Sequence, residues 1–251
     1  MLLFKIFLAP VLIALVSLAG RKWGPAVSGW LLGMPLTSAP VLFFLAVEQG
    51  PQFASRAAQG GLLGILAWAA FNLVYAWCSL KMPWWWSTLV GWLVYSVIAV
   101  LLAPVTLALL WAFVLVSVAL ALILWAFPRM PQSASPVVHG KHELALRMAT
   151  ASVTVVTLTG IAELLGPSAS GILTTFPAYT TILAVFSHRQ QASAAVNVLK
   201  GVVAGLYTAV TFFVVLSVAL LHLHVATAFA LAVTSGMLVQ AASLLYVQRG
   251  A

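Results

Sequence analysis

The residues with the most specific spacing form a duplicated element of Gly, Pro and Ser. It reads GPAVSGWLLGMP over 24–35 and GPSASGILTTFP over 166–177, so six of twelve positions are identical at an offset of 142. A Gly-Pro pair suits the start of a helix, and a Pro about ten residues later interrupts the hydrogen-bond ladder. The sequence therefore predicts two broken helices at matching positions.

Each break would leave a carbonyl without its helical donor, since Pro35 cannot donate to Leu31, nor Pro177 to Leu173. Within a bilayer such a carbonyl must meet protein, a polar side chain or water. Interrupted helices in two repeats are typical of a transporter's central site, whereas a plain structural kink is the alternative. The candidate substrate-binding residues at the breaks are Ser28, Leu31, Pro35, Thr37, Ser38, Ser170, Leu173, Thr174, Thr175, Pro177, Tyr179 and Thr180.

Other polar residues fall inside apolar stretches, where they are functional candidates by default. Those in the helices that follow the breaks are Asn72, Tyr75, Tyr207 and Thr211. The candidates for coupling or gating are Glu48, Glu163, His188, Arg189 and Lys200. The two Glu could equally be interface charges, and Lys200 could simply extend its ammonium to the headgroups. The paired motifs Gly60-x-x-x-Gly64 and Gly201-x-x-x-Gly205 predict close helix packing against the broken helices.

Enzyme signatures are missing from the sequence. It has no nucleotide-binding loop, no H-E-x-x-H, no G-x-S-x-G and no Asp. Two-carboxylate and Ser-His-Asp chemistry are therefore not expected. The His pairs at 139/142 and 222/224 lack a companion Cys, so we expect no metal site. The sequence predicts no catalytic residues and no cofactor.

The composition excludes a soluble domain. Of 251 residues, 64% are hydrophobic and 6% are charged, and the mean hydropathy is +1.14. Disordered chains show the opposite balance. The apolar stretches are long and unbroken, which favours helices over an outer-membrane barrel. We therefore predict an all-α polytopic membrane protein whose partner is the lipid bilayer. The net charge of +8 reports orientation rather than nucleic-acid binding, and homo-oligomerisation is left open.

The apolar pattern predicts nine transmembrane helices. They cover roughly 3–20, 26–47, 57–80, 84–103, 105–127, 144–165, 169–187, 195–221 and 225–247. Pro104 separates the fourth from the fifth, because 84–127 is too long for one span. We assign residues 1–103 to a first unit and 144–251 to a second, joined by a linker helix and loop at 104–143. A single linker helix between two four-helix units makes the units an inverted repeat.

The basic residues predict an orientation. With nine spans, one side collects Arg21, Lys22, Lys81, Arg129, Lys141, Arg147, Arg189, Lys200 and Arg249. The other side holds only Lys5 and Arg56. Since Lys and Arg concentrate in cytoplasmic loops, we expect the N-terminus outside and the C-terminus inside.

Two stretches resemble the GlpM family of small bacterial inner-membrane proteins. They are SGWLLGMP at 28–35, with the following helix and Glu48-Gln49-Gly50 leading to Arg56, and SGILTTFP at 170–177. Met34 stands where the family has Phe. The family has about one such four-helix unit, so this chain would be a fused duplication. The resemblance implies the bacterial inner membrane and supplies no substrate or catalytic residue.

Together these patterns predict a transporter for a small neutral, zwitterionic or singly charged solute. The two broken helices would meet near the midplane, and one unit would rock against the other to alternate access. Two alternatives stay open: a channel, or a non-transporting inner-membrane factor for envelope polysaccharide or lipid assembly.

Overall fold

The structure, a computed structural model, is mainly helical in the part of the chain that it describes. It describes residues 11, 14–20, 22–35, 38–130, 146, 149, 153, 172 and 174–249, and it contains no strand in these ranges. The predicted all-α class is confirmed. Five of the described helices are long and apolar enough to cross a bilayer. The protein is therefore a membrane protein, while the total of nine spans stays a prediction.

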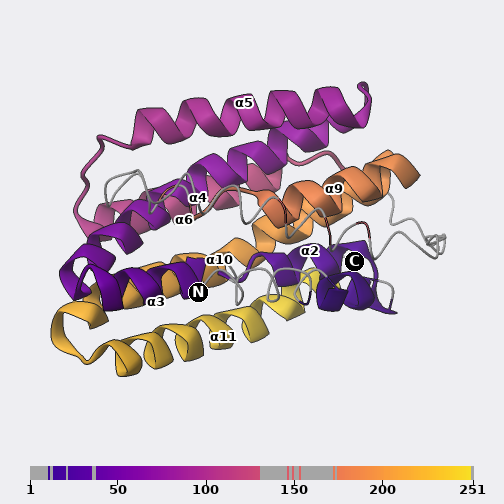
Figure 1. The fold of residues 1–251 in the computed structure, drawn as a ribbon. Helices are drawn as coiled ribbons and strands as arrows, with labels where there is room; N and C mark the ends of the chain where they lie inside the picture. Colours follow the sequence, from indigo (N-terminus) through magenta and orange to yellow (C-terminus); the bar gives the residue numbers. More distant parts are fainter. Residues whose placement is uncertain are drawn as a thin grey trace.

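The helices follow the predicted spans closely. Their bounds are α2 Pro25–Leu32, α3 Ser38–Glu48, α4 Pro51–Ser79, α5 Trp84–Leu102, α6 Leu109–Ala126, α9 Ala178–Gln190, α10 Ala192–His222 and α11 Val225–Arg249 (Figure 1). The predicted span 26–47 is interrupted between α2 and α3, where Pro35 lies. Span 169–187 is interrupted by a turn at Thr174 and Thr175, ahead of Pro177 and α9. The predicted separation at Pro104 lies between α5 and α6.

Two Gly-Pro pairs set the starts of α2 and α4. Gly24 and Gly50 both have φ 93°, in the left-handed region that side chains rarely adopt. Pro25 and Pro51 then occupy the first helical position, where a missing N–H costs nothing. Each pair therefore turns the chain sharply and begins the next helix at once.

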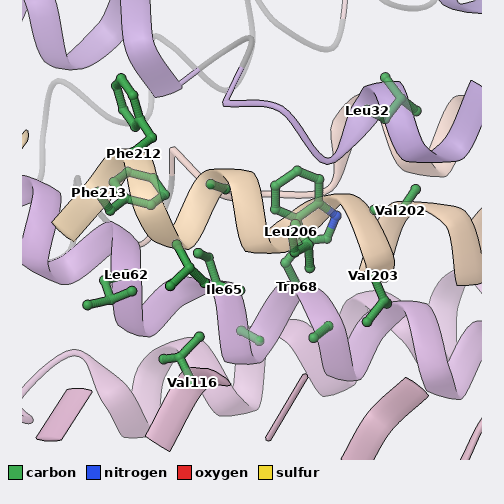
Figure 2. Packing of buried hydrophobic residues seen from close by; sticks show 14 of the residues in the cluster. Leu32, Leu62, Ile65, Trp68, Val116, Val202, Val203, Leu206, Phe212 and Phe213 are labelled. Carbon is green, nitrogen blue, oxygen red and sulfur yellow. The ribbon is translucent and has the colours of Figure 1, made fainter. Parts of the chain in front are cut away.

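The centre of the molecule is the contact between α4 and α10, the two longest helices. They run antiparallel, because Gly61 faces Phe213 and the Ser55 hydroxyl donates to the carbonyl of Ser217 at 2.6 Å. Figure 2 shows their side chains interleaving, with Leu206 of α10 beside Trp68 of α4. Helix α10 also contacts α2, α6, α9 and α11. Together, α4 and α10 contact every other described helix.

Helices α5, α6 and α11 surround this centre and expose apolar side chains. Only Ala112, Val116 and Leu120 of α6 are buried, and they form one inward stripe. The rest of α6 is half-buried or exposed, and Trp111 and Trp125 are among its exposed side chains. Such faces suit hydrocarbon, where apolar exposure costs nothing and association depends on close packing.

The charged residues of the described chain separate by bundle end. Lys81 follows α4, Arg129 follows α6, and Arg189 lies in the last turn of α9. The Trp77 indole donates to the Ala126 carbonyl at 3.1 Å, which places the ends of α4 and α6 together. Arg56, in the second turn of α4, lies at the opposite end. The two ends thus carry the unequal charge that the sequence predicts.

Candidate functional site at the two helix breaks

The first break exposes the carbonyl of Trp30 at the end of α2. This oxygen accepts the N–H of Gly33 at 3.2 Å and the side-chain amide of Gln240 at 2.9 Å. Gln240 lies on α11 and is buried, and its own side-chain oxygen accepts the hydroxyl of Thr208 on α10. A side chain from the second predicted unit thus closes the break, in the sense that it supplies a hydrogen-bond donor to the carbonyl at the end of α2.

The prediction that Leu31 carries the free carbonyl at this break is wrong. The Leu31 oxygen accepts the N–H of Met34 at 3.3 Å. Just before Pro35 the helix ends in a 3₁₀-type turn, in which each N–H donates to the carbonyl three residues earlier. The Leu31 carbonyl therefore has a main-chain donor within its own turn. The oxygen that takes a distant side-chain donor is one residue earlier, at Trp30.

The second break has the same arrangement at Ile172. Its carbonyl accepts the N–H of Thr175 at 3.0 Å and the Thr175 hydroxyl at 2.6 Å. It also accepts the phenolic hydroxyl of Tyr95, 2.9 Å away on α5. Tyr95 belongs to the first predicted unit. Each break is therefore closed by the fourth helix of the other unit.

The two breaks are equivalent in sequence as well as in contacts. Ile172 is Trp30 plus 142, and Gly205 is Gly64 plus 141. A Cβ on Gly205 would overlap the Trp30 carbonyl, and a Cβ on Gly64 would lie 3.2 Å from the Ile172 carbonyl. Glycine is needed at both places because a broken helix lies directly against the backbone of α4 or α10. These matched contacts support an inverted repeat, and the unit boundaries stay a prediction.

The two breaks meet at one small cavity. The Ser38 hydroxyl at the start of α3 donates to the carbonyl of Thr174 at 3.0 Å, from the first break to the second. A cavity of about 10 Å³ lies beside this contact, lined by Leu32, Met34, Trp68, Thr174, Phe176, Pro177, Ala178, Tyr179 and Thr180. That volume is close to the least that holds one water molecule. The two breaks therefore close on each other and leave almost no space.

Trp68 and Phe176 line this cavity, and the rings of Trp92 and Tyr95 lie next to Phe176. The Trp68 indole of α4 donates to the Thr180 hydroxyl at 3.2 Å, and Trp92 of α5 donates to the Thr181 hydroxyl at 3.1 Å. Phe176 packs edge-on against Tyr95 at 5.2 Å between ring centroids. Short polar groups at the breaks thus receive hydrogen bonds from rigid aromatic donors.

Several predicted site residues hydrogen-bond to their own helix or to α6 and not across the breaks. The Ser28 hydroxyl returns to the Pro25 carbonyl of its own helix, and Thr211 returns to the Tyr207 carbonyl. The Tyr207 hydroxyl donates to the carbonyl of Ser117 on α6, at 3.2 Å. Asn72 donates to the Trp68 carbonyl one turn earlier. Thr37, Ser170, Leu173 and Glu163 lie outside the described residues.

The gating candidates divide between the two ends of the bundle. Glu48 is exposed at the end of α3, and Arg189 is exposed in the last turn of α9. His188 lies past the predicted span 169–187, with its ring nitrogen Nδ1 3.5 Å from the Tyr75 hydroxyl. Burial lowers the pKa of this imidazole, partly offset by a backbone hydrogen bond at Ser79. Lys200 is half-buried on α10, next to Gly201.

Sequence reasoning missed the residues that close the breaks. Tyr95 and Gln240 each lie near the middle of a predicted fourth helix, and both side chains are buried. Trp68 and Trp92 were also overlooked, because an aromatic residue in an apolar helix is ordinarily packing. A strongly polar side chain such as Gln240 within an apolar run was the available signal.

In comparisons with protein-family models, with curated proteins and with solved structures, nothing matched this chain. The resemblance to the GlpM family therefore stays a prediction, and the functional argument depends on the geometry of the breaks.

Proposed function

We propose that this membrane protein moves a small solute across the bilayer by alternating access. The observation that carries the proposal is the reciprocal closure of the breaks. Trp30 and Ile172 end equivalent half-helices, and each carbonyl is covered by a donor from the other unit. Half-helices that end near the membrane centre at the interface between repeats are the substrate-binding arrangement of many secondary transporters.

The closed centre favours a transporter over a channel. An open pore needs a continuous aqueous path, whereas the cavity between the breaks is about 10 Å³. Rocking of one unit against the other would separate Ser38 from the Thr174 carbonyl, 3.0 Å apart here. That movement would widen the cavity and free main-chain oxygens, hydroxyls and indole donors for a solute. These groups suit a small neutral, zwitterionic or singly charged molecule.

The orientation is part of the proposal. The end with Lys81, Arg129 and Arg189 would face the cytoplasm, with the C-terminus inside and the N-terminus outside. The bacterial inner membrane is the proposed location, and neither catalysis nor a cofactor is required.

The test is flux through purified protein in liposomes. Glycerol, alanine and acetate represent the three solute classes, and each is offered as a radiolabelled tracer. We expect saturable uptake and counterflow for at least one class. Uptake that exceeds that of protein-free liposomes and rises linearly with concentration would instead indicate the channel alternative. An absence of flux for all three classes would move the envelope-assembly factor ahead.

A reversible cross-link sharpens this test. The pair Ser38→Cys and Thr174→Cys, in a Cys78→Ser background, can be bridged by a short bifunctional methanethiosulfonate. We expect bridging to stop uptake and a reducing agent to restore it. The matched control is Thr234→Cys, on the exposed side of α11, which should transport with or without the reagent.

A further inference from the structure

A second, larger cavity lies near the bundle end that carries Arg56. Its volume is about 380 Å³, within the range of small-molecule sites. It lies between the first part of α4, the end of α5, the 103–108 connection and the start of α6. Figure 1 shows these segments together at one end of the bundle. The lining residues are Arg56, Gln59, Gly60, Leu63, Leu102, Val105, Thr106, Leu107, Leu109, Ala112 and Ile172.

One of the described lining residues of this cavity carries a charge. Arg56 is the cation among the described lining residues, and none of them is acidic. Its guanidinium offers a planar set of donors that matches the two oxygens of a carboxylate or a phosphate. Gln59 and Thr106 add neutral hydrogen-bonding groups beside it. The polar part of the cavity is therefore suited to an oxyanion.

The remaining wall is apolar and reaches a helix break. Leu63, Leu109 and Ala112 line it, which suits a short aliphatic group attached to the oxyanion. Ile172 also lines it, and its carbonyl is the one closed by Tyr95. The cavity thus extends from a cation near the bundle end to the residue that ends a broken half-helix.

We infer that this cavity binds a small monoanion with a short apolar part, its oxyanion on Arg56. The same chemistry is present in a short-chain carboxylate and in the phosphate of a lipid headgroup. Binding at the cavity requires no transport. That the bound ion is the transported solute rests on the proposed function, and it would narrow the solute classes to the anionic one.

The experiment measures binding in a non-ionic, phosphate-free maltoside detergent. Sodium butyrate is titrated against the unfolding temperature at constant ionic strength, with neutral butyramide as the matched probe. We expect a saturable rise with butyrate alone. Arg56→Gln should weaken the apparent affinity about tenfold, as loss of a charge-assisted contact does, and Arg56→Lys should retain part of it. Arg129→Gln removes an exposed cation at the other end and should change nothing.

A second variant tests the cavity without touching the charge. Thr106 is exposed in the connection between α5 and α6, so Thr106→Trp can occupy the cavity without disturbing a buried position. We expect it to abolish butyrate binding while the ligand-free unfolding temperature stays unchanged. Equal binding of butyramide, or butyrate binding that survives both Arg56→Gln and Thr106→Trp, would overturn the inference.

Two further measurements distinguish a lipid headgroup from a soluble carboxylate, and binding from transport. Dihexanoyl phosphatidylglycerol replaces butyrate in the first. An Arg56-dependent rise in unfolding temperature with this lipid and not with butyrate would overturn the inference that the cavity binds a soluble carboxylate. In the second, Arg56-dependent butyrate binding without butyrate uptake above that of protein-free liposomes would leave the site standing and count against transport of this ion. Butyrate uptake that Arg56→Gln leaves intact would overturn the step that the bound ion is the transported solute, while the transporter would stand.

Discussion

Tyr95 donates its phenolic hydroxyl to the Ile172 carbonyl at 2.9 Å, and so closes a helix that lies 77 residues later in the chain. Gln240 does the same for Trp30, 210 residues earlier, at 2.9 Å. In a bilayer an uncovered carbonyl costs several kcal/mol, because no water replaces the missing donor. The two side chains therefore link the two units at the helix breaks, where a main-chain carbonyl lacks its helical donor.

The two closures should differ in how much stability they contribute. Tyr95→Phe leaves the Ile172 carbonyl two donors from Thr175, so we expect a loss of about 1 kcal/mol. Gln240→Leu leaves the buried Thr208 hydroxyl without this acceptor as well, and we expect about 2–3 kcal/mol. Unfolding in detergent, followed by circular dichroism, gives the order. Thr234→Val, on the exposed side of α11, is the control. Equal losses for both variants would contradict the assignment of donors.

Gly205 of α10 should tolerate substitution far less well than Gly236 of α11. Gly205→Ala places a methyl group into the Trp30 carbonyl and must push α2 away, at about 1–3 kcal/mol. Gly236→Ala meets only a Thr208 methyl at 3.3 Å and the Thr208 carbonyl at 3.4 Å, so α11 can adjust slightly. Unfolding temperatures of the purified variants compare the two directly. A Gly205→Ala protein as stable as Gly236→Ala would show that α2 does not lie against α10.

The sidedness of the two bundle ends can be read from single cysteines. In a Cys78→Ser background, Lys81→Cys and His222→Cys place exposed thiols at opposite ends. We expect an impermeant maleimide added to intact cells to label His222→Cys only. Labelling of Lys81→Cys becomes possible once the membrane is permeabilised. Labelling of both from outside, or of Lys81→Cys alone, would reverse or refute the orientation.

The stability of the fold should fall in mild acid through His188. Burial lowers the pKa of His188 in the folded state below the ordinary value of 6.5. The folded state therefore prefers the neutral imidazole, and stability is greatest above pH 6.5 and declines as the pH falls below it. His188→Gln should flatten the dependence between pH 7 and 5. Unfolding temperatures across that range test this, with His222→Gln, an exposed histidine, as the control.

Much of this fold could be read from the sequence because the signals were local. Pro35, Pro104 and Pro177 each lie where helices stop, since proline cannot continue the hydrogen-bond ladder. Gly64, Gly201 and Gly205 lie in close contacts, as small residues at helical spacing indicate.

What could not be read was the pairing across the chain. Nothing near Trp30 in the sequence points to Gln240, and the tight turn that satisfies Leu31 depends on the path around Pro35. The sequence predicts close helix packing at Gly60, whereas the structure places this residue in the lining of the larger cavity. Motif spacing gives the position of a break, while the partner that covers it is set by packing.

The contact between α2 and α10 bears on how the chain is made. Residues 25–32 emerge from the ribosome long before residues 192–222, so α2 enters the membrane with neither Gly205 nor Gln240 yet translated. Until then the Trp30 carbonyl has only the donor from Gly33. A truncated polypeptide ending after α6 would contain α2 without the Gln240 donor and without the contact with α10. Quality control at the insertion machinery could thus recognise an early intermediate in which α2 is inserted but its terminal carbonyl is not covered. Only insertion of α10 and α11 completes that contact.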